Sequence, residues 1–448
     1  MTISFKTLGC RLNQAEEADF AAQFQAAGCR LADKGETPDV LVLHSCAVTR
    51  AAERETFRQI RAWRRDPALT HTKIVVTGCA VACNAAELFR DAGADLVIAK
   101  GDLPVLASLV VESQKSNVEC RILGARTPDL GPRTLDSYPM RHKRALLKVQ
   151  DGCGFNCAYC IVPLTRGKPV SRPWGDTLSA AESLLDKGYR EIVLTGCNLA
   201  CYRDGARGLA DLADAICGLA EPYGARIRLG SVEPCLCDDE LLSVLLARRN
   251  LCRFLHYPIQ SVDSAVLQAM GRRYTAEQIL SLLQRLREKV PLIGLGADFI
   301  TGLPGEDEAA FAQTCALVEQ IPFVHIHVFP FSPRQGTRAP TLPNRPSRTV
   351  AKERASRLRV IGDASAAAYR QLLLGHETQV LVEKRLSDCT VTGWNEGYVL
   401  CRFHSDAPVA TLASFTPTHI EDGMLTDTCG GLRRFPGERE IGRKGVLF

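Results

Sequence analysis

Short hydrophobic runs alternate with helical patterns over the first 112 residues. Buried strands are predicted at ISFKTL, DVLVLHS, KIVVTG and ADLVIAK, which begin at residues 3, 39, 73 and 94. Amphipathic stretches lie between these runs, for example residues 13–28, which end on Gly28, a helix stop. This alternation predicts an N-terminal doubly wound α/β domain, residues 1–112, with a parallel sheet.

The alternation returns on a larger scale after a break. Residues 113–142 are polar and rich in Pro and Gly, which is typical of a linker. From 143 to 374 six apolar strands alternate with helices; the strands are expected at 145–150, 191–196, 226–230, 254–260, 295–301 and 325–331. Six βα units predict a partial barrel, and in such barrels the working face is the carboxyl end of the strands.

The C-terminal part has a different pattern. A basic helix is expected at 347–374, and residues 375–430 alternate in short strands separated by Gly and Asp. This pattern predicts a small antiparallel β-barrel of the oligonucleotide-binding type. Residues 431–448 form a basic tail, for which either phosphate contact or a solvated charge run is possible.

Composition narrows the class of protein. The chain has 448 residues, 46% of them hydrophobic, and a net charge of +5, so a nucleic-acid surface would have to be local. No apolar run approaches the roughly 20 residues of a membrane span, and the start lacks a secretory pattern, so we expect a cytoplasmic protein with no membrane contact. Nineteen cysteines in a reducing compartment favour metal binding over disulfides.

Two sets of three cysteines stand out. Cys153, Cys157 and Cys160 form a C-x3-C-x2-C pattern directly after the first barrel strand. The second set follows the first three strands of the N-terminal sheet and consists of Cys10, Cys46 and Cys79. The carboxyl ends of parallel strands share one edge, so the second set is expected to converge. Buried, inert cysteines are the alternative for that set.

The motifs resemble those of a known family. QDGCGFNCAYCIVPLTRGKPVSR resembles the cluster loop of radical S-adenosylmethionine (SAM) enzymes. TLGCRLNQ, HSCAVT, VTGCAV, RLGSVEP, LHYPIQSVDSAVLQAMGRRYT, DFITGLPGE and HVFPFSPRQGT together resemble the methylthiotransferases. The first two of these are most similar to the branch that acts on threonylcarbamoyladenosine in tRNA. His44-Ser45 replaces the usual Asn-Thr before Cys46, and Ala15-Glu16 replaces an acidic or aromatic pair.

The resemblance implies two [4Fe–4S] clusters, each held by one cysteine set and each with one open iron. The cluster at the barrel would bind SAM and generate a radical, and the auxiliary cluster would carry sulfur. By the same resemblance the expected SAM contacts are Tyr159, Gly196, Glu233 and Gln260. A capping role for Glu233 and a core role for Gln260 are equally compatible with the sequence. The C-terminal barrel resembles a TRAM domain.

The expected function is therefore methylthiolation at C2 of N6-threonylcarbamoyladenosine next to the anticodon. Its partners would be tRNA and an electron donor such as a flavodoxin or ferredoxin. Methylthiolation of isopentenyladenosine in tRNA or of a ribosomal-protein aspartate is the alternative within the family. A non-catalytic iron–sulfur RNA-binding or sensor protein is the alternative of another class, against which the full barrel argues.

Other candidate ligands are left open by the sequence. Five more cysteines have metal-like spacing but no assigned role: Cys83, Cys197, Cys201, Cys235 and Cys237. His325 and His327 alternate on the last barrel strand, and packing is the interpretation favoured for both. The remaining cysteines are interpreted as small hydrophobic residues.

Overall fold

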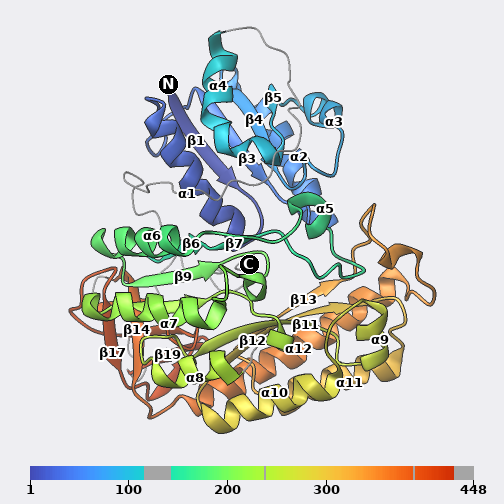
Figure 1. Cartoon of the computed structure of the whole chain (residues 1–448), viewed down its shortest axis with the longest axis vertical. Coiled ribbons are helices and arrows are strands. Elements are labelled where there is room, and N and C mark those ends of the chain that lie inside the picture. Colours follow the sequence, from blue (N-terminus) through green and yellow to red (C-terminus); the bar gives the residue numbers. More distant parts are fainter. Residues whose placement is uncertain (116–142, 237–238, 387–388, 428–448) are drawn as a thin grey trace.

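A computed structural model of the chain describes residues 1–115, 143–236, 239–386 and 389–427. Figure 1 shows an N-terminal unit (blue) above a barrel of mixed colours, with a C-terminal sheet (red) at the lower left. Most of the expected linker and the whole basic tail lie outside the described residues, so both stay predictions.

The N-terminal unit is a five-stranded parallel sheet in the order β2-β1-β3-β4-β5. Its strands are β1 (Thr2–Thr7), β2 (Arg30–Leu31), β3 (Val40–Ser45), β4 (Lys73–Gly78) and β5 (Leu96–Val97). Its helices are α1 (Arg11–Ala26), α2 (Arg50–Arg65), α3 (Ala86–Asp91) and α4 (Leu106–Lys115). The expected strand at 94–100 is therefore only two residues long, since a 3₁₀ helix begins at Lys100.

Each face of this sheet has its own hydrophobic core. Phe20 and Phe24 of α1 and Val110 of α4 pack on one face. Ile60 of α2 and Phe89 of α3 pack on the other. Helices on both faces confirm the predicted doubly wound sheet. The strand order reverses between β1 and β3, and the crevice at such a switch point is where ligands bind in open α/β sheets.

The central unit has six parallel strands. They are β6 (Ala145–Lys148), β9 (Glu191–Thr195), β10 (Arg226–Leu229), β11 (Phe254–Gln260), β12 (Gly294–Thr301) and β13 (His325–Pro330). Parallel ladders join β6-β9-β10 and β11-β12-β13, and single parallel bridges join the two groups. The six βα units confirm the partial barrel expected from the sequence.

Helices cover the outside of this barrel (Figure 1). They are α6 (Trp174–Asp186), α7 (Leu209–Ala220), α8 (Asp239–Ala247), α9 (Ser264–Ala269), α10 (Ala276–Lys289), α11 (Glu308–Gln320) and α12 (Arg348–Leu372). The short helix α5 (Val162–Arg166) instead lies between the barrel and the N-terminal unit. Several start at side-chain caps; for example, the Thr275 hydroxyl accepts from Gln278 N at the start of α10. A small hairpin, β7 (Gln150–Asp151) and β8 (Val170–Ser171), frames the cysteine loop between its strands.

The C-terminal unit is a six-stranded sheet in the order β17-β14-β15-β16-β19-β18. Its strands are β14 (Thr378–Arg385), β15 (Thr390–Asn395), β16 (Leu400–His404), β17 (Leu412–Phe415), β18 (His419–Glu421) and β19 (Met424–Thr426). All pairs are antiparallel except β16 with β19. In the described residues no ladder joins the edge strands β17 and β18, so closure into a TRAM-like barrel is not confirmed.

Two buried arginines bind this sheet to the barrel. Arg226 Nη1 donates to the Gln379 carbonyl at 2.6 Å, and Arg228 Nη2 donates to the Asn395 carbonyl at 2.9 Å. Glu191 on β9 accepts from both guanidinium groups. The sheet is therefore an integral part of the barrel's support, because removing it would leave two buried cations without these carbonyl partners.

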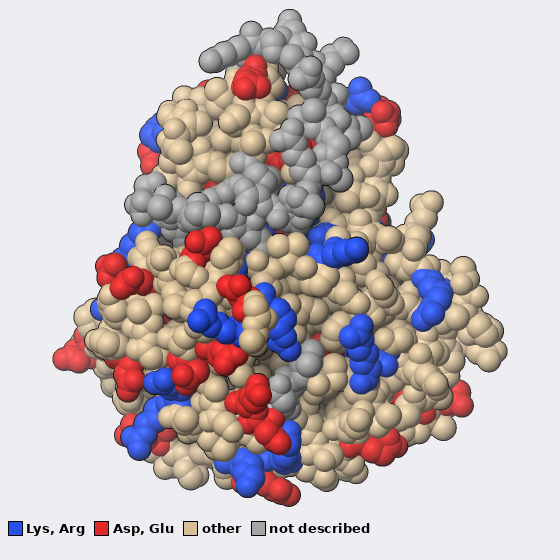
Figure 2. Space-filling model, viewed as in Figure 1, with Lys and Arg blue, Asp and Glu red and all other residues tan. Residues whose placement is uncertain are grey.

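Charge is mixed on the molecular surface. Figure 2 shows Lys and Arg interspersed with Asp and Glu on one face, with no broad field of a single sign. This agrees with the small net charge of +5. Within the described part of the chain, every helix falls short of the length and apolarity that crossing a membrane requires.

Candidate active site

A cavity with a volume of about 1980 Å³ lies where the three units meet. Both cysteine sets line it: Cys10, Cys46 and Cys79 from the N-terminal sheet, and Cys153, Cys157 and Cys160 from the barrel. Residues as distant in sequence as 10 and 160 therefore face one space. The fold thus brings together the two sets that the sequence predicted separately.

The N-terminal set lies at the switch-point edge of the sheet. Cys10 is the residue before α1, while Cys46 and Cys79 directly follow β3 and β4. Gly9 has a φ of +97°, and a Cβ there would lie 2.7 Å from Cys46 Sγ, so glycine lets the two loops meet. Burial raises the pKa of Cys46 to about 12. A bound metal would therefore have to displace a thiol proton.

The barrel set lies in the loop between β7 and α5. Cys157 Sγ accepts a hydrogen bond from Arg272 Nη1 at 3.1 Å, and Asn198 Nδ2 lies 3.6 Å from Cys153 Sγ. Burial raises the pKa of Cys160 to about 12. Two donors from other loops thus already fix the orientation of this set.

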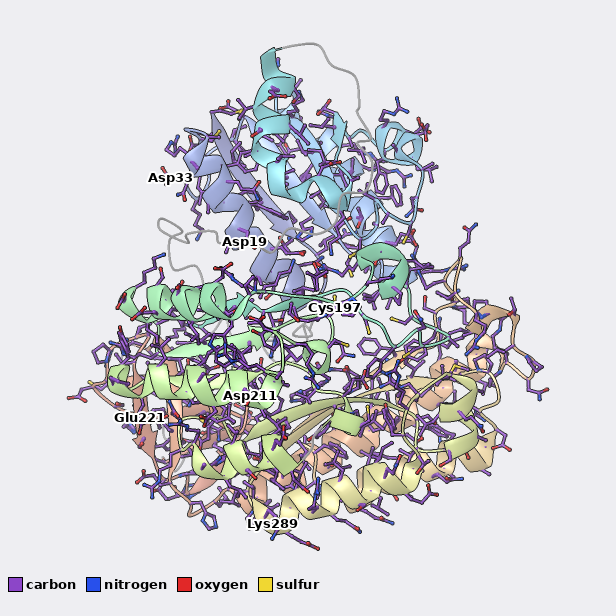
Figure 3. The ribbon with its side chains drawn as sticks, viewed as in Figure 1. Asp19, Asp33, Cys197, Asp211, Glu221 and Lys289 are labelled. Atoms are coloured by element: carbon purple, nitrogen blue, oxygen red, sulfur yellow. The ribbon has the colours of Figure 1, made fainter. Side chains whose placement is uncertain are left out.

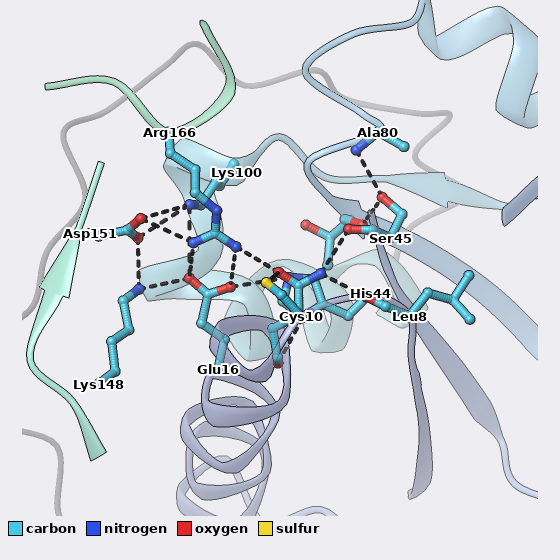
Figure 4. A network of polar contacts seen from close by, with 12 residues as sticks. Leu8, Cys10, Glu16, His44, Ser45, Ala80, Lys100, Lys148, Asp151 and Arg166 are labelled. Carbon is cyan, nitrogen blue, oxygen red and sulfur yellow. Dashed lines mark hydrogen bonds and ion pairs between the residues drawn. The ribbon is translucent and has the colours of Figure 1, made fainter. Parts of the chain in front are cut away.

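A buried ionic network joins the N-terminal unit to the barrel next to Cys10 (Figure 4). Arg166 Nη1 lies 3.0 Å from Glu16 Oε1 and 3.0 Å from Asp151 Oδ1. Lys148 Nζ lies 2.7 Å from Glu16 and 2.8 Å from Asp151, and Lys100 Nζ lies 3.2 Å from Asp151. Burial alone would raise the pKa of Glu16, but the three cations outweigh it and hold that pKa well below its usual value. Both carboxylates are therefore charged at neutral pH.

The four residues expected to contact SAM all line the cavity: Tyr159, Gly196, Glu233 and Gln260. Arg272, which the sequence analysis did not single out, connects two of them. It lies 3.2 Å from the Tyr159 hydroxyl and forms an ion pair with Glu233. Burial nevertheless raises the pKa of Glu233.

The other two SAM-contact candidates have backbone features of their own. A Cβ at Gly196 would lie 2.9 Å from Gln150 Oε1, which gives this glycine a packing reason as well. Gln260 has a φ of +71°, a strained value for a residue with a side chain, at a bulge in β11. Such strain is found at functional sites more often than elsewhere.

The extra cysteines divide into two groups. Cys197, which is labelled in Figure 3, lines the cavity between the N-terminal unit and the barrel. Its Sγ lies 3.2 Å from Asp151 Oδ1. Cys201 shares a hydrogen bond with Cys153. Cys83 lies against Arg334, Cys235 is exposed, and Cys237 lies outside the described residues. Of the described cysteines in this group, only Cys197 and Cys201 lie close to the barrel set.

A group of histidines also faces the cavity. His256, His325 and His327 line it together with Asp298. Asp298 Oδ1 lies 3.0 Å from His256 Nε2 and 2.9 Å from His327 Nδ1. The sequence analysis favoured packing for His325 and His327, but residues i and i+2 of a strand share one face, and both face inward here.

Comparisons with known proteins place these features in a family. Residues 147–318 match the radical SAM superfamily model, and residues 2–99 match a model described as uncharacterized protein family UPF0004. Among solved structures, the radical SAM methyltransferase TsrM of Kitasatospora setae has a similar fold. The match covers 73% of this chain and 74% of TsrM. The TM-score is 0.54 and the identity 13%, which supports the fold alone.

Curated relatives match nearly the whole chain. The threonylcarbamoyladenosine tRNA methylthiotransferase MtaB of Bacillus subtilis is 32% identical over 89% of this chain and 88% of its own. The tRNA-2-methylthio-N(6)-dimethylallyladenosine synthase of Erythrobacter litoralis is 32% identical over 86% of each chain. The ribosomal protein uS12 methylthiotransferase RimO of Syntrophus aciditrophicus is 34% identical over 85% and 86%. With the cysteine sets in one cavity and this similarity along its length, the chain belongs to the radical SAM methylthiotransferase family.

Proposed function

We propose that this enzyme methylthiolates tRNA at C2 of N6-threonylcarbamoyladenosine next to the anticodon. The observation that carries the proposal is the convergence of two cysteine sets on one cavity, because the reaction needs both a radical source and a sulfur carrier. MtaB, which carries this activity in its name, is similar over 89% of the chain. The relatives that act on dimethylallyladenosine or on uS12 are equally similar, so the substrate is decided by the experiments below.

Two [4Fe–4S] clusters and SAM are the cofactors of the proposed reaction. Each set of three thiols converges on the cavity and fits a cluster that keeps one iron open. When bound, the clusters and SAM supply the radical and the sulfur. Cys153, Cys157 and Cys160 would hold one cluster, and Cys10, Cys46 and Cys79 the other.

Residues of the chain itself orient these groups. Arg272 is buried and touches Cys157, Tyr159 and Glu233, so one cation fixes three cavity-lining side chains. Two side chains supply polar atoms for the amino group or ribose of SAM: the Glu233 carboxylate, which is ion-paired with Arg272, and the Gln260 amide.

A polyanionic substrate is supported by the residues around the cavity. The cationic side chains that line it include Arg50, Arg54, Arg345, Arg348, Lys352 and Lys384. They come from α2, α12 with its preceding loop, and β14, so they belong to all three units. Phosphate contacts from such groups would position an RNA, while a loop base splayed from its stack would enter the cavity.

The remaining partners follow from the same proposal. Cleavage of SAM consumes an electron, so a reductant such as a flavodoxin or ferredoxin must dock on the enzyme. A tRNA substrate and a low-potential donor are both cytoplasmic, and we propose that compartment for this chain.

The proposal predicts a defined iron content. After anaerobic reconstitution we expect about eight iron and eight sulfide per chain, as two four-iron clusters require. Replacing Cys153, Cys157 and Cys160 together with Ala should halve both values and leave one cluster spectrum. Iron and sulfide assays with Mössbauer spectroscopy measure this. Four iron per wild-type chain, or zinc in their place, would contradict the proposal.

The substrate class is tested by charge reversal at the cavity mouth. Arg345, Arg348 and Lys352 are exposed and line the cavity. Their combined replacement with Glu should weaken tRNA binding about 100-fold at 0.1 M salt, since each lost phosphate contact removes about 0.7–0.9 from the salt slope. Filter binding of an unmodified anticodon stem-loop and of uS12 over a salt series measures this.

The matched control reverses the same number of charges away from the cavity. Lys34, Arg249 and Lys289 are exposed and do not line it, so their replacement with Glu should leave tRNA affinity nearly unchanged.

Nucleoside mass spectrometry of tRNA from a strain lacking the enzyme identifies the base. If both variants bind tRNA equally and uS12 is methylthiolated instead, the tRNA assignment is wrong.

A further inference from the structure

Three imidazoles converge inside the barrel. His256 comes from β11, and His325 and His327 come from β13. One ring nitrogen of each lies within 4.8 Å of the other two. All three line the same cavity as the two cysteine sets. They are a group of potential metal ligands separate from those cysteines.

The strand between them leaves space where the rings meet. Gly296 on β12 pairs with His256 on one side and with His325 on the other. A Cβ at position 296 would lie 2.5 Å from His256 Nδ1 and 2.9 Å from His325 Nε2. Both nitrogen atoms therefore point into the volume that a side chain would fill. The glycine is required because any other residue would occupy that volume.

Asp298 orients two of the rings from one row further along the barrel. Its Oδ1 lies 3.0 Å from His256 Nε2 and 2.9 Å from His327 Nδ1. His256 is thereby set to present Nδ1, and His327 to present Nε2. Histidines that bind a metal through one nitrogen commonly donate the other N–H to a carboxylate in this way.

We propose that His256, His325 and His327 bind one borderline divalent transition-metal ion, such as Zn²⁺, with Asp298 as the positioning residue. Two nitrogen ligands on one zinc ion lie at most about 4 Å apart, given bond lengths of about 2.0–2.1 Å. Small ring rotations therefore suffice to close the site. Three protein ligands leave a fourth position open to the cavity, for water or for a phosphate or carboxylate oxygen of a substrate.

The charges around the site are consistent with a cation. The Asp298 carboxylate lies in direct contact with two of the rings. Arg11 of α1 is the cation whose charge acts on His325, and its guanidinium is hydrogen-bonded to the neutral Tyr398 hydroxyl. One negative charge thus stands in contact with the ligands, while the charge of Arg11 opposes cation binding without such a contact.

The test measures metal content and ligation rather than activity. The full chain, with its iron–sulfur clusters reconstituted, is equilibrated with one equivalent of Zn²⁺ and desalted. We expect about one zinc per chain, with a first shell of imidazole nitrogen at about 2.0–2.1 Å by X-ray absorption at the zinc edge. Iron content should not change, because the cysteine sets are not involved.

Variants identify the ligands. His325→Ala should abolish stoichiometric zinc, and Asp298→Asn should weaken binding about 10–100-fold through loss of ring orientation. Exposed His71→Ala is the matched control and should retain zinc. If His325→Ala fails to fold, Asp298→Asn decides alone. Sulfur ligands at about 2.3 Å, or zinc retained in both cavity variants, would overturn the site and leave the methylthiotransferase assignment intact.

Discussion

Loss of either cysteine set should abolish methylthiolation, but only loss of the barrel set should abolish SAM cleavage. We expect the variant with Ala at Cys153, Cys157 and Cys160 to produce no 5′-deoxyadenosine above background. The variant with Ala at Cys10, Cys46 and Cys79 should still produce it, uncoupled from product. The physical reason is that the sets come from separate units and meet only across the cavity.

Liquid chromatography with mass spectrometry of deoxyadenosine and of modified nucleoside separates these outcomes. The buried Cys217 on α7 and Cys252 just before β11 do not line the cavity and provide a control, since their replacement with Ala should leave both yields intact. The single variant Cys46→Ser repeats the test with less change in packing. If the N-terminal variant transfers sulfur as the wild type does, that set is structural and the two-cluster mechanism is wrong.

Replacing Arg166 with Met should destabilise the protein by about 3–5 kcal/mol, because it leaves two buried carboxylates with fewer counter-charges. Arg166 is 3% exposed and donates to Glu16 and Asp151 across the junction of the units (Figure 4). We also expect product formation to fall more than SAM cleavage, since the N-terminal set would no longer be held opposite the barrel set. Urea denaturation and the two product assays measure the effects.

The same network sets a pH dependence. The pKa of Glu16 is lower in the folded protein than its usual 4.5, so its contribution to stability is present above about pH 4.5 and is lost as pH falls further. Arg166→Met should flatten this acid limb. The double variant Glu16→Gln with Arg166→Met should recover part of the loss at pH 7, because one buried charge is removed with its partner. An unchanged acid limb in Arg166→Met would exclude the network as its source.

Exposed charge pairs provide the comparison for this effect. Arg58 and Glu55 form an ion pair on the surface of α2. Arg58→Met should change the free energy of unfolding far less than Arg166→Met does, because water screens such pairs. Burial, rather than ion pairing as such, is the reason why Arg166→Met is expected to lower the free energy of unfolding so strongly.

Local pattern was sufficient for the elements and for one cysteine set. The hydrophobic pattern predicted β4 at 73–78 and β11 at 254–260 with the observed bounds, since a buried strand is a short apolar run of neighbouring residues. The C-x3-C-x2-C spacing of Cys153, Cys157 and Cys160 is likewise local. Strand order then explains Cys10, Cys46 and Cys79, whose convergence follows from a rule of parallel sheets.

Contacts between distant segments were not predictable in this way. Arg166 and Arg272 look like ordinary surface cations in the sequence, yet each is buried and has a partner more than 100 residues away: Glu16 for Arg166 and Cys157 for Arg272. The short strands β18 and β19 were not predicted, because three residues carry too little periodicity. Closure of the C-terminal sheet into a barrel, predicted from its pattern of short strands, is not confirmed, because ladder pairing depends on the register of strands far apart in the chain.

The amino-acid sequence is sufficient to predict most of the helices and strands, the two cysteine sets and the resemblance to a family. The fold alone places His256, Gly296 and His325 in one row across three strands, and Asp298 beside His327 in the next. The reason is physical. Side-chain chemistry and short-range periodicity are properties of neighbouring residues, whereas a cavity and its buried charges exist only once strand register and the packing of separate units are fixed.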